Sequence, residues 1–157
     1  NKTKNSNSAI IKNITSINFN AVEAKIFIKS SEIKNKRFGF QLFSESKDIG
    51  FPIIFEPESK SILVGSTKAS LDFLNLYKTK NIEITIFIDH FLIEVFINNL
   101  QSIVGIYEKY ENKNKINAYS FNGSITIEKM IIWKLKKINT GYIKAKKNKI
   151  WHVKEKI

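Results

Sequence analysis

The chain has 157 residues, a length typical of one domain, and its 43% hydrophobic and 12% aromatic residues are typical of a globular protein. No apolar run approaches the roughly 18 residues that span a bilayer, so we predict no membrane segment. Cysteine is absent, which excludes disulfides and thiol catalysis. The two histidines, His90 and His152, are too few and too far apart to predict a metal centre, and we expect no cofactor. The chain begins with Asn1 rather than Met, which indicates a fragment or a processed product whose compartment stays open.

The net charge of +12 has two interpretations. Of the 26 basic residues only Arg37 is an arginine, and asparagine and isoleucine are also abundant. Because lysine, asparagine and isoleucine share A/T-rich codons, the base composition of the source genome can explain the charge. A nucleic-acid-binding protein would instead gather several arginines and exposed aromatic residues on one surface. We therefore expect no specific nucleic-acid partner, only a weak and salt-sensitive attraction to polyanions.

The first part of the chain contains short runs with the two-residue alternation of β-strands. Residues 1–13 are polar and charged, and we expect a linker or a frayed terminus there. The alternating run AVEAKIFIKSS begins at Ala21. The next run, RFGFQLF, places Phe38, Phe40 and Leu42 on one face. Both runs are predicted to be strands.

A turn at Pro57 separates two further predicted strands in the segment GFPIIFEPESKSILVGST, because proline suits the first central position of a turn. Glu56 and Glu58 flank this proline and are expected to be solvated. The following stretch, KASLDFLNLYKTK, is the one candidate for a helix, since its leucines fit either a helical or a strand period.

The clearest pattern lies in the segment NIEITIFIDHFLIEVFINNL. Its aliphatic residues occupy even positions at first (Ile82, Ile84, Ile86 and Ile88) and odd positions later (Ile93, Val95 and Ile97). This change of parity predicts a turn or bulge near Asp89 and His90. The segment is therefore predicted to be a hairpin whose two strands turn the same aliphatic face towards the core.

The rest of the chain continues in the same way. QSIVGIY predicts a strand, and Asn122-Gly123 predicts a second hairpin between AYSF and SITIE, since Asn-Gly is the strongest short hairpin signal. MIIWKLKK closes the series. Roughly ten to twelve short strands without a long amphipathic helix predict an all-β fold, an antiparallel two-sheet β-sandwich of the concanavalin-like or laminin-G-like jelly-roll kind, over residues 14–138. Residues 139–157 form a basic C-terminal tail to which no structure is assigned.

Asp89 and Glu94 are the candidate catalytic pair. A glycosidase needs two carboxyl groups at one sugar ring, one protonated as the acid and one ionised as nucleophile or base. The two residues straddle the predicted turn, so strand parity does not give their separation. The alternatives, which we favour, are a turn residue that binds backbone amides for Asp89 and a strand residue paired with a lysine for Glu94. No G-x-S-x-G motif supplies a nucleophile for a triad with His90, and no glycine-rich phosphate-binding motif is present.

Two tryptophans are candidates for stacking on sugars. An aromatic side chain on an exposed sheet face would suit a carbohydrate-binding module, and Trp133 and Trp151 could serve in this way. Trp133 lies within MIIWKLK, however, where a position in the core is the commoner outcome.

The hairpin and the strand after it resemble the C-terminal β-sandwich of glycoside hydrolase family 32, which includes invertases, sucrose-6-phosphate hydrolases, inulinases and levanases. That family shows the pattern I-F-x-D-x-S-x-x-E-x-F-x-N-x-G, and then a strand that ends in a basic residue, an aliphatic residue and tyrosine. The matching residues are Ile86, Phe87, Asp89, Glu94, Phe96, Asn98, Ile106 and Tyr107. FGFQLF, FEPESKSILVGSTKAS and FNGSITIEKMIIWKLKKI are also similar to segments of the family, so the likeness extends over about residues 21–138.

Several positions depart from the family pattern. They are Phe91 in place of serine, Leu100 in place of glycine, Gly65-Ser66 in place of Asp-Arg, Ala69 in place of serine and Gly105 in place of the basic residue. The resemblance implies that catalysis belongs to a separate five-bladed propeller that precedes the sandwich, with its acidic residues in N-D-P-N, R-D-P and E-C motifs. This chain has no Asp-Pro and no cysteine, and its single arginine precedes Phe38.

The resemblance implies a non-catalytic sandwich whose partner is the catalytic propeller of the same enzyme, a hydrolase of sucrose or fructans that needs no metal. Asp89, Glu94, Phe96 and Asn98 would then be structural residues of the family motif. A homodimer and a carbohydrate ligand stay open as further partners. The alternative is a free-standing, lectin-like carbohydrate-binding module.

Overall fold

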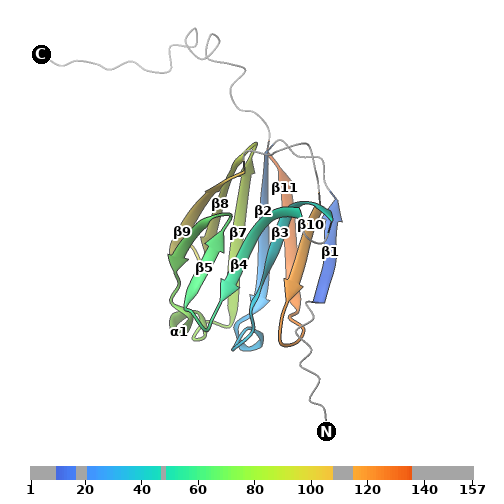
Figure 1. The fold of residues 1–157 in the computed structure, drawn as a ribbon. Helices are drawn as coiled ribbons and strands as arrows, with labels where there is room; N and C mark the ends of the chain where they lie inside the picture. Colours follow the sequence, from blue (N-terminus) through green and yellow to red (C-terminus); the bar gives the residue numbers. More distant parts are fainter. Residues whose placement is uncertain (1–9, 17–20, 47–48, 108–114, 136–157) are drawn as a thin grey trace, which may run out of the picture.

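A computed structural model of the protein describes residues 10–16, 21–46, 49–107 and 115–135 (Figure 1). The elements in chain order are β1 (Ile10–Ser16), β2 (Ala21–Lys29), the 3-10 turn η1 (Ser30–Glu32), β3 (Phe38–Ser46), β4 (Ile49–Glu56), β5 (Ser61–Val64), β6 (Thr67–Ser70), α1 (Phe73–Leu76), β7 (Asn81–Asp89), β8 (Leu92–Ile97), β9 (Gln101–Ile106), β10 (Lys115–Ser120) and β11 (Ile127–Lys134). Within these described ranges, no helix is long and apolar enough to cross a membrane.

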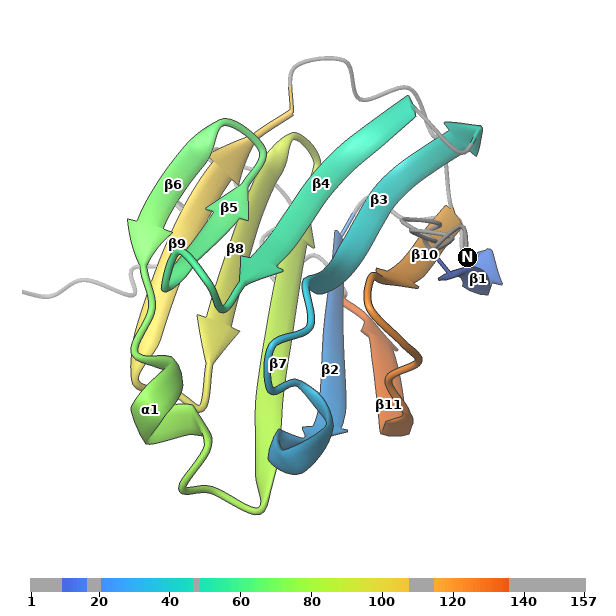
Figure 2. The same cartoon turned by 60° about the horizontal axis from the view of Figure 1, so that its bottom comes forward.

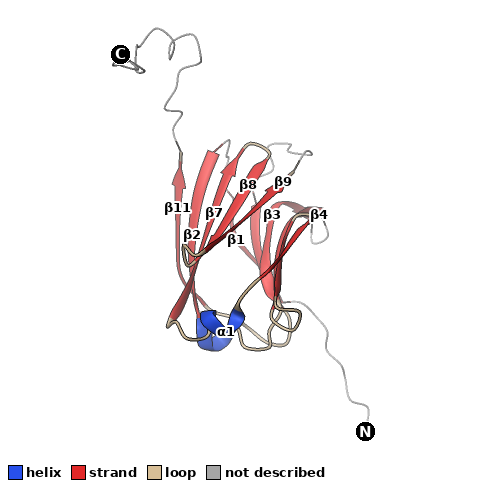
Figure 3. Ribbon diagram, turned by 90° about the vertical axis from the view of Figure 1, so that its left-hand side faces the viewer, coloured by secondary structure: helices blue, strands red, loops and turns tan. Residues whose placement is uncertain are grey.

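The strands form two antiparallel sheets that lie face to face (Figure 3). One sheet has six strands in the order β1-β10-β3-β4-β5-β6, and the other has five in the order β11-β2-β7-β8-β9. The one-turn helix α1 carries the chain from β6 of the first sheet to β7 of the second at one end of the sandwich (Figure 2). The predicted all-β, two-sheet antiparallel sandwich is confirmed.

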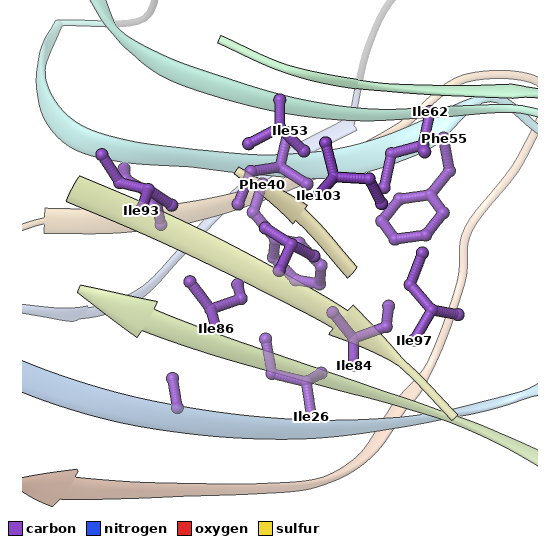
Figure 4. Close-up of a cluster of buried hydrophobic side chains, with 14 of the residues drawn as sticks. Ile26, Phe40, Ile53, Phe55, Ile62, Ile84, Ile86, Ile93, Ile97 and Ile103 are labelled. Carbon is purple, nitrogen blue, oxygen red and sulfur yellow. The ribbon is translucent and has the colours of Figure 1, made fainter. Parts of the chain in front are cut away.

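Aliphatic and aromatic side chains from the two inner faces fill the space between the sheets (Figure 4). In β2 and β8, burial alternates with every residue, as the two-residue period of a strand requires when one face meets a core. The five-stranded sheet contributes isoleucines such as Ile26, Ile84 and Ile86, and the six-stranded sheet contributes Phe40 and Phe55, all at most 1% exposed. Each such burial contributes roughly 1.5–3 kcal/mol, so this core is the main source of stability.

The hairpin of β7 and β8 has the predicted register. Asp89 pairs with Leu92, so that only His90 and Phe91 form the loop between the strands. His90 takes a φ of 54°, in keeping with the positive φ angles of tight hairpin turns. The aliphatic face predicted from the change of parity is buried along both strands.

The predicted hairpin at Asn122-Gly123 is wrong. β10 pairs with β1 and β3 in the six-stranded sheet, whereas β11 pairs with β2 in the five-stranded sheet. Asn122 and Gly123 take φ angles of 62° and 118°, but their turn leads from one sheet to the other. It is held by Ser120 Oγ, which donates to the Gly123 carbonyl (2.8 Å), and by Thr126 N, which donates to Glu32 Oε2 (2.6 Å) and so lowers the pKa of Glu32. Asn-Gly favours a turn conformation, but it does not determine whether the two flanking strands pair with each other.

Two segments of ambiguous sequence take definite forms. The candidate helix KASLDFLNLYKTK contains most of β6 and the single turn α1, which Asp72 caps by accepting a hydrogen bond from Asn75 N (3.1 Å). β1 begins at Ile10, inside the range expected to be a linker, and residues 10–13 pair with β10. The antiparallel ladder to β10 supplies backbone hydrogen bonds to this edge strand.

Candidate functional site

The two candidate catalytic carboxylates lie diagonally on the outward face of β7 and β8. Asp89 pairs with Leu92 and Glu94 pairs with Phe87, so the two carboxylates are not directly opposite each other. The Asp89 side chain is 69% exposed, and its Oδ1 lies 2.7 Å from Nδ1 of His90. Neither carboxylate lines either of two cavities formed by the described residues, one at the ends of β3, β4 and β10 and one between the two sheets beside β10 and β11. The arrangement is that of a turn residue and a strand residue on an open surface.

Neither carboxylate makes the contacts that its expected structural role predicts. Asp89 contacts an imidazole ring and not the backbone amides that were expected. Glu94 was expected to pair with a lysine, but within the described ranges no lysine forms an ion pair with it, because its neighbours across the sheet are Phe87 and Val104. Glu94 is therefore a half-buried carboxylate between two apolar side chains.

The remaining residues of the motif order the end of the hairpin. Asn98 Oδ1 accepts a hydrogen bond from Glu83 N (2.8 Å), and Asn98 N donates to the Glu83 carbonyl (2.8 Å). Asn98 has a φ of 49°, a conformation that asparagine tolerates better than most residues. The Phe96 ring meets the Phe87 ring edge-on, with centroids 5.7 Å apart. These contacts tie the β8–β9 turn to β7.

The outer face of the five-stranded sheet carries a row of side chains that alternate between apolar and acidic. Strand pairing places Trp133, Glu23, Phe87, Glu94 and Val104 side by side across all five strands. The three apolar members alternate with the two carboxylates. An outward strand face made for water would carry polar residues throughout, so this row indicates a specialised surface.

Exposed apolar side chains gather on this same face. Seven large hydrophobic side chains are exposed in the described part of the chain, and five of them lie on this face or at its rim. They are Trp133 (43% exposed), Val104 (43%), Ile106 (60%), Leu135 (38%) and Phe91 (56%). Single exposed apolar residues are ordinary, whereas a contiguous group marks an interaction surface.

The sequence predicts only part of this surface. Trp133 fell in a segment where a core position was the commoner expectation, and the structure places it on the outer face. Val104 and Ile106 were missed, although QSIVGIY carries a signal. Both Ile103 and Val104 are apolar in that strand, so each of its two faces presents apolar side chains. Trp151 lies outside the described residues.

The charges on this face are unevenly paired. Lys25 and Glu83 form an ion pair at 2.8 Å, and the hydrogen bond to Glu83 raises the pKa of Lys25. Glu23 and Glu94 form no ion pair with any residue of the described ranges, although both are half-buried. In a chain with a net charge of +12, this row thus presents two carboxylates on either side of Phe87.

Solved structures share the fold at low sequence identity. The exo-inulinase of Aspergillus awamori is 12% identical with a TM-score of 0.60, covering 85% of this chain and 30% of that enzyme. The β-fructofuranosidase of Aspergillus kawachii is 15% identical with a TM-score of 0.55, covering 80% of this chain and 25% of that enzyme. Chicken galectin 2 is 11% identical with a TM-score of 0.54, covering 78% of this chain and 97% of the galectin. The chain thus spans less than a third of each enzyme.

No curated protein matches the sequence of this chain. The model of a protein family described as "Glycosyl hydrolases family 32 C terminal" matches residues 1–134, which is most of the chain and includes the motif of β7 and β8. The chain therefore belongs to the C-terminal domain family of the family 32 glycosyl hydrolases.

Proposed function

We propose that the chain is the non-catalytic sandwich of a β-fructofuranosidase-type enzyme, and that the outer face of its five-stranded sheet docks on the catalytic domain. The observation that carries this proposal is the row of Trp133, Phe87 and Val104 with its two half-buried carboxylates. A domain that works alone in water gains nothing from exposing these apolar groups together, whereas a domain with a permanent partner can bury them.

The lengths of the structural relatives support a partner in the same polypeptide. The region similar to this chain covers only 30% of the Aspergillus awamori exo-inulinase and 25% of the Aspergillus kawachii β-fructofuranosidase. Most of each enzyme therefore lies outside the sandwich. Because this chain has no Asp-Pro and no cysteine, the family's catalytic motifs would have to come from such a separate domain. We propose sucrose or a fructan as the substrate of the complete enzyme, in keeping with the names of these two relatives.

The carboxylates define the chemistry of the docking partner. Burying an unpaired carboxylate costs several kcal/mol, so an apolar partner alone would bind this face poorly. Glu23 and Glu94 belong to the strands on either side of β7, and their backbones are therefore about 10 Å apart. An arginine of the partner fits between them, because a guanidinium group can stack on Phe87 and donate hydrogen bonds to a carboxylate.

The test compares one substitution in two contexts, the chain alone and the complete product of its gene. Val104→Asp places a charge on a side chain that is 43% exposed and lies opposite Glu94, so the chain alone should lose no more than about 1 kcal/mol of unfolding free energy. In the complete protein the same aspartate would enter the buried interface. We expect a lower unfolding temperature and weaker hydrolysis of sucrose or inulin there. Glu94→Gln should behave in the same way through the loss of its cationic partner.

Leu74→Asp is the matched control. Leu74 is 65% exposed on α1, away from the outer face of the five-stranded sheet, so this variant should change neither context. Equal effects of Val104→Asp in both contexts would refute the docking surface. A complete gene product without a family 32 catalytic domain would refute the enzyme assignment and favour a free-standing sandwich. Chicken galectin 2, which the similar region covers over 97% of its length, shows that this fold can form a whole protein.

A further inference from the structure

A cavity of about 460 Å³ opens at the outer side of the six-stranded sheet, at the end where β3 begins and β4 and β10 end. Its walls include Arg37, Glu56, Glu58 and Phe121, which come from three separate segments. The size is within the range of small-molecule sites, which measure roughly 300–1,000 Å³. We propose that this cavity binds a neutral oligosaccharide.

The charged side chains at the centre of the cavity contact one another and a neighbouring serine. Arg37 Nε lies 3.3 Å from Glu56 Oε1, while Glu56 Oε2 accepts a hydrogen bond from Ser59 Oγ (3.2 Å) and lies 3.7 Å from Lys68 Nζ. Phe121 N donates to the Arg37 carbonyl (2.8 Å), which continues the ladder of β3 and β10. Glu56, expected to be solvated, is thus an anchor that orients the guanidinium group before any ligand arrives, which lowers the entropic cost of binding.

The guanidinium group also rests on an aromatic ring. Arg37 Cζ lies 5.3 Å from the centroid of the Phe121 ring, and that ring meets Tyr119 edge-on at 6.0 Å. Because Nε is engaged by Glu56, the terminal Nη groups are the donors left over, and no residue of the described ranges accepts a hydrogen bond from them. They are available to a ligand in the cavity.

Two asparagines supply further hydrogen-bonding groups. Asn35 and Asn122 line the cavity, both are exposed, and both have left-handed φ angles, of 57° and 62°. Within the described part of the chain, no hydrogen bond engages either side-chain amide. Each amide can both donate and accept, as can a sugar hydroxyl, whereas a guanidinium group only donates and a carboxylate only accepts. The cavity therefore offers the mixed set of groups that recognises adjacent hydroxyls.

Charge balance selects a neutral ligand over an anionic one. The walls carry one cation, Arg37, and two carboxylates, Glu56 and Glu58, while Lys68 contacts Glu56 from outside the walls, so basic groups are not in excess at the cavity although the net charge of the chain is +12. A site for a phosphate would gather basic groups without carboxylates beside them. The ring of Phe121 and the adjacent Pro57 add apolar surface against which the C–H groups of a sugar can pack.

This inference concerns a different surface from the proposed docking face. The docking face is the outer side of the five-stranded sheet, and the cavity lies at the outer side of the six-stranded sheet. The outer sides of the two sheets face away from each other (Figure 3). Both could be occupied at once. The choice of a fructo-oligosaccharide as the first probe rests on the proposed function, whereas the site itself does not.

The test is a titration of the chain, labelled with ¹⁵N, with 1-kestose, with maltotriose and with glucose 6-phosphate. We expect at least one of the two neutral sugars to shift the amide signals around Arg37 and Asn122. Asn122→Gly removes the amide group while keeping a residue that adopts a positive φ, and it should weaken binding about five- to tenfold through the loss of one or two hydrogen bonds. Asn99→Gly is the matched control, because Asn99 has a φ of 55° and lies in the β8–β9 turn, away from the cavity.

Several outcomes would overturn the inference. They are the absence of binding by both neutral sugars, binding that Asn122→Gly and Asn99→Gly weaken equally, or tighter binding of glucose 6-phosphate than of either neutral sugar. Arg37→Gln provides a second variant, for which a loss larger than that of Asn122→Gly is expected. The two proposals can be tested separately, because Val104→Asp changes the docking face and leaves the cavity unchanged. If the docking proposal fails, sugar binding at the cavity can still be measured, and if sugar binding fails, docking can still be measured.

Discussion

Gly105 contacts a buried aromatic ring, and its replacement by alanine is expected to destabilise the protein. A Cβ atom at Gly105 would lie 2.5 Å from Cζ of Phe51 and 2.9 Å from the carbonyl oxygen of Val64. Gly65 approaches the same ring, where a Cβ atom would lie 2.4 Å from Cε2. The ring is 2% exposed and also meets Tyr107 edge-on at 5.7 Å, so it has little room to move aside.

The sign of the change in unfolding free energy shows whether side-chain packing or backbone entropy dominates at position 105. Gly105 does not have a positive φ, and alanine at such a position normally stabilises a protein by about 0.4–1 kcal/mol through the unfolded chain. Overpacking a core costs about 1–3 kcal/mol, and one of the two contacts is with a backbone oxygen that cannot rotate away. We expect a net loss of about 1–2 kcal/mol of unfolding free energy for Gly105→Ala.

Urea unfolding followed by circular dichroism measures this loss, and a double-mutant cycle assigns it to the ring. Phe51→Leu makes room at the site, so the double variant with Gly105→Ala should lose less than the sum of the single losses, by about 1 kcal/mol. Unchanged or increased stability of Gly105→Ala, or strictly additive losses, would refute the argument. The contact also explains a departure from the family pattern, because a basic side chain at position 105 would collide with Phe51.

The hairpin and the isolated chain provide the remaining tests. Ile86 is fully buried between the sheets, so Ile86→Ala should cost about 2–5 kcal/mol in chemical denaturation, and the outward-facing Thr85→Ala about 1 kcal/mol. Equal losses at the two positions would contradict the assigned faces. The chain alone should release no fructose from sucrose, sucrose-6-phosphate or inulin, because it carries none of the family's catalytic motifs. Release that disappears in a folded Glu94→Gln variant would contradict the structural assignment of Glu94.

The strands with strict alternation could be predicted because the alternation of neighbouring residues shows which side chains share a face. In β7 and β8 the alternation and its change of parity determine the strands, the turn and the buried face. The pairing partner of a strand, in contrast, is not determined by the residues next to it in the sequence. The turn at Asn122-Gly123 has the conformation that its residues favour, yet the strands on either side of it join different sheets. Nothing in the six residues around that turn distinguishes the two outcomes.

The face of the sheet on which a side chain lies does not by itself determine how exposed that side chain is. Parity places Thr85 on the outer face, where a solvated side chain would be expected, but Thr85 is only 3% exposed. Its register neighbours on β2 and β8 are Lys25 and Phe96, and these long side chains cover the short threonine. A two-residue period predicts the direction of a side chain, while the size of its cross-strand neighbours decides how much water reaches it.

The two proposed surfaces differed in how far the sequence could reveal them. Phe87 and Phe96 stand out on the docking face, because large apolar residues on both sides of a strand are unusual when one side faces water. The cavity depends on Arg37, Glu56 and Phe121, which come together only when β3, β4 and β10 pair. Each of these residues can be explained by the local structure of its own segment, so no pattern in the sequence predicts that the three lie close together.

The positions of the two surfaces determine what a bound sugar could do. A ligand held between Arg37 and Asn122 would lie on the sheet that faces away from a catalytic domain docked on the other sheet. Such a site would not deliver a single substrate molecule to the reaction, but it could keep the enzyme on a long polymer whose other segments reach the catalytic domain, since a second attachment raises the effective concentration of the first. If the complete protein is the proposed hydrolase, Asn122→Gly in it should therefore weaken hydrolysis of polymeric inulin and leave hydrolysis of sucrose unchanged. Val104→Asp, which acts through the docked domain itself, should weaken both, and a parallel loss on the two substrates in Asn122→Gly would contradict this division of roles.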